Sequence, residues 1–110
     1  MLEYAPSQQT RLLSAATTTQ TGASTGVAGV NRVVRARVTG TGAVSATINI
    51  YGAMNGDVTA ATATLIGTLS PTGTTTAVDA FAMAAPWPEM FADLTAISGT
   101  SAAVTVTVAS

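Results

Sequence analysis

Cysteine, histidine and lysine are absent from this chain of 110 residues. Without cysteine the chain has no disulfide and no thiolate metal site, so its redox compartment cannot be inferred. Without histidine or lysine, general acid–base catalysis would have to rely on carboxylates, hydroxyls and two tyrosines. These absences make an enzyme the least expected class of protein, and we predict no cofactor and no bound metal.

Charge and aromatic side chains are scarce as well. Charged residues make up 8% of the chain and aromatic residues 5%, and the formal net charge is −1. Nucleic-acid and membrane binding are therefore not expected, because both need clustered cations. No apolar run approaches about 18 residues and residues 1–4 do not resemble a signal peptide, so we expect synthesis in the cytoplasm. Small apolar side chains and low net charge favour self-association.

Alternating apolar and polar residues give the clearest structural signal. Residues 30–38 and 43–51 alternate as half-buried strands do, with a Thr-Gly-Thr-Gly turn expected at residues 39–42. In the first strand Arg35 and Arg37 share a face, while the aliphatic residues between them face the core.

The rest of the chain gives the same signal more weakly. Further strands are expected at residues 11–16, 60–69, 76–83, 90–97 and 105–108, with a long loop at 17–29 and turns at 70–73 and 98–100. Residues 90–97 also fit helical spacing, but every neighbouring element favours a strand. We predict an all-β fold, an antiparallel β-sandwich or small jelly-roll-like barrel of about 6–8 short strands. Residues 1–10 are expected to form an extended N-terminal arm and residues 11–110 a single β domain.

Three arginines, Arg32, Arg35 and Arg37, lie close together on one predicted strand and are candidate interface residues. Arginine makes bidentate contacts with carboxylates and is enriched at interfaces, which favours a subunit contact. The alternatives are a solvated strand face with an Arg-to-Asp pair across the sheet, or a weak nucleic-acid contact.

Large apolar residues gather at two places. Leu2 and Tyr4 lie in the N-terminal arm, where a neighbouring subunit could bury them, although a frayed terminus is the alternative. Trp87 and Phe91 lie near a proline-broken segment, where Trp87 is either a core anchor or an interface hot spot. All four are candidate interface residues.

Three weaker patterns are better explained by surface or turn residues than by a catalytic, calcium-binding or phosphate-binding site. Glu89 and Asp93 could be proposed as a glycosidase pair, but surface carboxylates are the simpler interpretation. Asp57, after an Asn-Gly turn, lacks the spacing of an EF-hand calcium loop. The glycines of residues 22–29 lack the lysine of a phosphate-binding loop.

Two segments carry a resemblance to a known family. Ala-Pro-Trp at residues 85–87 is followed by Ala-Asp-Leu-Thr-Ala-Ile-Ser-Gly-Thr at 92–100 and a valine-rich strand at 104–108, while residues 42–52 read Gly-Ala-Val-Ser-Ala-Thr-Ile-Asn-Ile-Tyr-Gly. Together with the Asn-Gly turn, this pattern resembles small virion proteins of tailed bacteriophages over the last two-thirds of the chain. Pro88 and Phe91 depart from that pattern, and the strand register places Phe91 outward.

The resemblance implies a non-enzymatic virion component. We expect a capsid decoration or cement protein on the outer capsid surface. Its expected partners are the major capsid protein and sister copies in a homotrimer. It would be made in the cytoplasm of a host bacterium. The alternatives are a tail or neck protein, such as a tube, adaptor or fibre-associated module, and a virion-surface carbohydrate-binding module that would use Tyr51 and Trp87.

Overall fold

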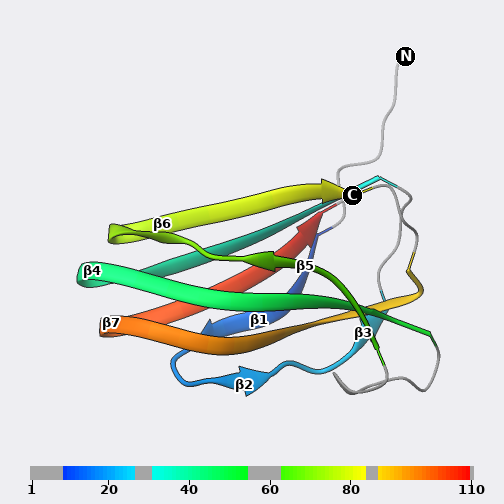
Figure 1. Ribbon diagram of the computed structural model, residues 1–110, viewed down its shortest axis with the longest axis horizontal. Coiled ribbons are helices and arrows are strands. Elements are labelled where there is room, and N and C mark those ends of the chain that lie inside the picture. The colour runs from blue at the N-terminus through cyan, green and yellow to red at the C-terminus, as the bar shows by residue number, and fades with distance from the viewer. Residues whose placement is uncertain (1–8, 27–30, 55–62, 84–86, 110) are drawn as a thin grey trace, which may run out of the picture.

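The computed structural model describes residues 9–26, 31–54, 63–83 and 87–109. These residues form one seven-stranded antiparallel sheet that is not closed into a barrel, and they contain no helix (Figure 1). The strands are β1 (Gln9–Ala16), β2 (Gln20–Thr21), β3 (Thr25–Gly26), β4 (Arg32–Ala53), β5 (Thr64–Leu69), β6 (Thr72–Met83) and β7 (Glu89–Ala109). The all-β prediction is confirmed, and so is a strand, not a helix, at residues 90–97.

Two long strands, β4 with 22 residues and β7 with 21, run antiparallel through the middle of the sheet. The first half of the sheet joins β1, residues 103–109 of β7, residues 32–39 of β4 and most of β6. The second half joins β2, β3, residues 89–98 of β7, residues 43–53 of β4 and β5. At the centre of the fold, these two long strands therefore stand where four short strands were predicted.

The two halves meet at a bend, where the sequence had indicated turns. Residues 39–42 and 98–100 lie inside β4 and β7, and the register shifts there in the β4–β6 and β4–β7 pairs. Extra residues on one strand of a pair bend and twist the sheet. Both long strands double back at this level, so that the teal and green parts of β4 run in opposite directions, as do the orange and red parts of β7 (Figure 1). Four residues with positive φ mark this level: Gly42, Thr75, Gly99 and Ser101. The change of chain direction predicted at these residues therefore occurs, but it lies inside continuous strands with bulges and not in separate turns between short strands.

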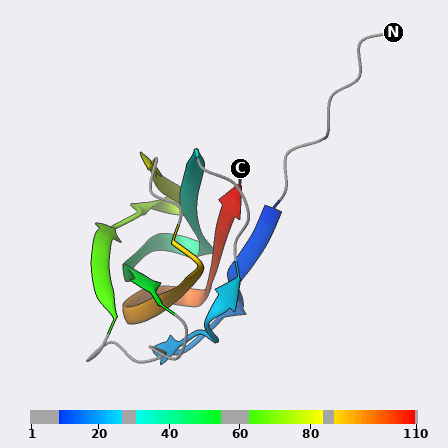
Figure 2. The ribbon, with the colours of Figure 1, turned by 90° about the vertical axis from the view of Figure 1, so that its right-hand side faces the viewer.

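Folding at the bend encloses one apolar core. The predicted alternation is confirmed in β4, where Val34, Ala36 and Val38 are buried and Val33, Arg35 and Arg37 are exposed. The red C-terminal part of β7 lies on one side in the end-on view and β5 on the other (Figure 2). Buried residues of both halves belong to a single cluster, which includes Val106 and Val108 from the first half and Ile48, Ile50 and Leu94 from the second.

The connections differ from the predictions in several places. The loop expected at residues 17–29 contains β2 and β3, which both pair with β7. Gln9 and Thr10, expected in the N-terminal arm, are the first residues of β1. The turn predicted at residues 70–73 is not formed: residues 70–71 only separate β5 from β6, because Leu69 pairs with Ile48 and Thr72 with Ser45 along the same side of β4. Residues 1–8, the Asn-Gly turn and residues 84–86 lie outside the described residues.

We predict that Gly99→Ala destabilises the fold more than Gly42→Ala does. Gly99 has φ +130°, and a Cβ there would lie 3.0 Å from the Ala43 carbonyl oxygen and 2.9 Å from Val44 Cγ1. Gly42 has φ +73°, and a Cβ there would have no atom within 4 Å. Urea denaturation should give a loss of about 1–2 kcal/mol for Gly42→Ala, from backbone conformation alone. For Gly99→Ala the loss should be about 2–4 kcal/mol, and equal losses would contradict the packing argument.

Candidate functional site

An exposed row of arginines crosses the outer surface of the first half. Arg35 and Arg37 point away from the core on β4, as predicted. Thr107 of β7 pairs with Arg35 on one side and with Arg11 of β1 on the other. Directly paired residues have their side chains on the same face. Arg11, Arg35 and Arg37 therefore share one surface, which we call the arginine face.

The arginine face has an apolar background. Val33 and Val78 lie on it and are 46% and 51% exposed. Ala80 pairs with Arg35 and Val78 with Arg37 across the β4–β6 ladder. Small uncharged side chains therefore surround the guanidinium groups, and no described carboxylate lies among them.

Arg32 does not belong to this face, although the sequence analysis grouped it with Arg35 and Arg37. Its position in the alternation matches that of Val34, and its side chain is only 3% exposed. Its Nη1 donates to the Trp87 carbonyl oxygen at 2.8 Å and lies 3.5 Å from Met90 Sδ. The prediction of Arg32 as an exposed interface residue is therefore wrong. Its role is to tie the start of β4 to the chain entering β7.

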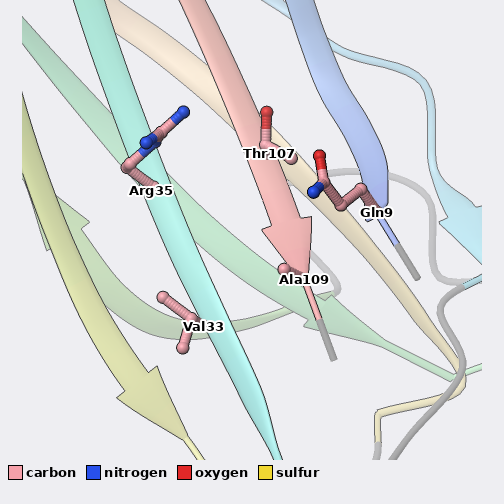
Figure 3. Close-up of a pocket in the computed structure, with 5 residues that line it drawn as sticks. All are labelled: Gln9, Val33, Arg35, Thr107 and Ala109. Atoms are coloured by element: carbon pink, nitrogen blue, oxygen red, sulfur yellow. The ribbon is translucent and has the colours of Figure 1, made fainter. Parts of the chain in front are cut away.

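A hollow of about 180 Å³ lies beside Arg35 on the arginine face. Its lining comes from three neighbouring strands, with Val33 and Arg35 from β4, Thr107 and Ala109 from β7 and Gln9 from β1 (Figure 3). The guanidinium, hydroxyl and amide groups can all donate hydrogen bonds. The hollow therefore offers donors over a small apolar floor, which suits a carboxylate carried on a short aliphatic stem.

The arginines of this face have no partner within the described part of the chain. No hydrogen bond or ion pair joins the guanidinium group of Arg11, Arg35 or Arg37 to another described residue. A guanidinium group carries five donors, so the donors of the face are available to water or to a second molecule. The Arg-to-Asp pair considered as an alternative is not formed, because Asp79 binds the backbone amides of Ser70 and Ala80 instead.

Trp87 packs against the core as a partly buried residue. Its indole lies on Gly52, where an added Cβ would fall within 2.3 Å of the ring, so only glycine leaves room for it. This packing matches the interpretation of Trp87 as a core anchor.

Phe91 lies on the outer side of β7, as the register predicted, but it is not exposed to solvent. It is 0% exposed and stacks on Tyr51, with ring centroids 5.1 Å apart and an angle of 15° between the rings. Tyr51 and Gly52 are adjacent on β4 and so face opposite sides of the strand. Tyr51 with Phe91 and Trp87 over Gly52 therefore lie on opposite sides of the sheet and do not line one sugar-binding groove.

Two carboxylates lie on the outer surface of the second half. Glu89 Oε1 accepts from Ser24 Oγ at 3.2 Å, and Asp93 Oδ1 accepts from Thr21 Oγ1 at 3.1 Å. Asn49 pairs with Asp93 across the β4–β7 ladder. We call the surface around Glu89 and Asp93 the carboxylate face. Both carboxylates keep only neutral hydrogen-bond donors within the described residues.

The sequence analysis found part of this arrangement. Arg35 and Arg37 were identified from alternation, whereas Arg11, Gln9 and Thr107 were missed, since only the β1–β7 register brings them alongside. Four residues named in the sequence analysis lie outside the described residues: Leu2, Tyr4, Gly29 and Asp57.

No group of three or more described acidic residues could hold a metal ion. No helix long and apolar enough to cross a bilayer occurs within the same residues. In comparisons with known proteins, no family model, no curated protein and no solved structure matched the chain.

We predict that Arg32→Met costs about 1–3 kcal/mol of unfolding free energy, because the Trp87 carbonyl oxygen loses a buried donor. Arg37→Met makes the same chemical change at an exposed position and should alter stability by no more than about 0.5 kcal/mol. Chemical denaturation of both variants measures the difference. An equal cost at the two positions would contradict the structural role assigned to Arg32.

Proposed function

We propose that this protein is a non-enzymatic virion structural component of the tailed-bacteriophage type, most specifically a capsid decoration or cement protein. It binds the outer surface of the head shell and stabilises the shell through contacts between subunits. The observation that carries this proposal is the arginine face, a sheet surface with three guanidinium groups that have no partner among the described residues.

The chemistry of the arginine face suits a protein contact. Arginine fits carboxylates with two parallel hydrogen bonds, and it is enriched where protein surfaces meet. Exposed Val33 and Val78 add apolar area that a partner can remove from water. Pairs of opposite charge at such a contact direct the approach of the partner and fix its orientation.

The fold supports the proposal in a second way. Residues 42–52 and 92–100, which carry the resemblance to phage virion proteins, lie in β4 and β7 and form most of the second half. We infer that the bent sheet serves as a β-sandwich, since both halves cover a single core. A rigid β surface of small uncharged side chains can lie flat against a shell.

The proposed partners are the major capsid protein and sister copies in a homotrimer. Each contact through two or three arginines is modest by itself. A subunit repeated over a shell binds at many points at once, and linked contacts multiply in strength. Weak individual contacts are therefore sufficient for a cement protein.

Cryo-electron microscopy of purified particles tests the location. We expect density for this chain at repeated positions over the outside of the head shell. A single ring at the neck or along the tail would instead support a tail or neck component. Absence from the particles would overturn the virion proposal.

Charge reversal tests the arginine face itself. We predict that Arg35→Glu with Arg37→Glu leaves the fold intact and reduces incorporation into particles at least about tenfold, the loss expected for about 1.4 kcal/mol of contact energy. Thr18→Glu with Thr19→Glu, in the exposed loop after β1, is the control for added negative charge. Quantitative mass spectrometry of purified particles measures the copy number. Unchanged incorporation of the arginine variant would refute the role of this face.

A further inference from the structure

Five charged residues of the described part of the chain are divided by sign between two outer surfaces, while Arg32 is buried and Asp79 lies on neither surface. Three of the four arginines lie on the arginine face, on the first half of the sheet. Glu89 and Asp93 lie on the carboxylate face, on the second half. The core lies between the inner sides of these halves, so the two faces point away from each other. A single copy therefore cannot bring its own arginines to its own carboxylates.

The two faces have matching dimensions. Glu89 and Asp93 are four residues apart on β7, which is about 13 Å along an extended strand. Arg11 and Arg37 are separated by two strand spacings and two residues, which is about 12 Å on the diagonal. Two ion pairs could form at once between the arginine face of one copy and the carboxylate face of another.

The hollow beside Arg35 gives this contact a place for the aliphatic part of an approaching side chain. Val33 and Ala109 offer apolar surface, while Thr107 and Gln9 offer further donors (Figure 3). A glutamate stem from a second copy fits such a lining better than a bare inorganic anion, which gains nothing from the apolar floor.

We propose that the arginine face is occupied by the carboxylate face of a second copy of this chain, in a head-to-tail contact. The proposal rests on the arginine face being a protein contact, as in the proposed function, and names its occupant. Because the two surfaces differ, a pair of copies keeps one free arginine face and one free carboxylate face, and the contact repeats. Such contacts close into a ring, as in a trimer, or continue as an open stack.

Sedimentation velocity of the full chain tests the contact. We expect the wild type to form oligomers at low salt and to dissociate at about 1 M salt, where the screening length falls to about 3 Å. Arg35→Gln with Arg37→Gln, and separately Glu89→Gln with Asp93→Asn, should each give monomers. The amide replacements keep the oxygen acceptors for Ser24 and Thr21, and circular dichroism checks that both variants fold.

Mixing the two variants is the decisive step. The arginine variant retains its carboxylate face and the carboxylate variant retains its arginine face, so the mixture should form a species of two chains and no larger one. Asp79→Asn removes a carboxylate outside both faces and should assemble like the wild type. A monomeric wild type at low salt, unchanged oligomers in either variant, or a mixture without pairing would overturn the head-to-tail contact.

Particle incorporation separates this inference from the proposed function. If the wild type is monomeric in solution and the arginine variant still fails to enter particles, the arginine face meets a capsid protein instead of a sister copy. The head-to-tail contact then fails while the virion role stands. If the wild type assembles head to tail but is absent from particles, the virion role fails and the contact stands.

Discussion

The bend through β4, β6 and β7 is the constraint on which the rest of the structure depends. The core is built mainly from alanine, valine and a few larger aliphatic residues, so each strand buries little apolar area. A flat sheet would leave this face in water. Bulges at one level, with glycine at residues 42 and 99, fold the sheet so that one half covers the other. The same fold turns the two outer surfaces away from each other.

Alternation predicted which side chains face the core along β4, because one face of that strand is buried on both sides of the bend. The same alternation places Arg32 with Val34 on the inner side, so the sequence already held the distinction between Arg32 and the exposed arginines. The sequence analysis grouped Arg32 with Arg35 and Arg37 because they are close in sequence, and so missed that Arg32 faces the core. The partner that makes burial of Arg32 tolerable, the Trp87 carbonyl oxygen, is 55 residues away and could not be predicted.

Other features depend on strand pairing that local sequence does not encode. Thr-Gly-Thr-Gly and Ser-Gly-Thr predict a change in chain direction, but a turn and a bulge use the same residues. Whether the chain closes a hairpin at such a site or bends within an unbroken strand is decided by the neighbouring strands, which here continue past both sites. Arg11 became part of the arginine face only through the β1–β7 register. Phe91 was placed outward correctly by alternation relative to Met90 and Ala92, yet stacking on Tyr51 on that outer side buries it.

The placement of arginines on one outer face and carboxylates on the other is the feature that the stability of the fold explains least. Exposed arginines whose side chains meet no partner in the described part of the chain add little to stability, and a net charge of −1 adds little to solubility. The chain covers most of its surface with threonine, serine and alanine, and β strands accept threonine readily at exposed positions. Charges that serve neither the core nor solubility are best explained by a contact outside the chain. Since the positive and negative groups lie on opposite sides of the same rigid sheet, a repeating contact uses both, and a single binary contact would use only one.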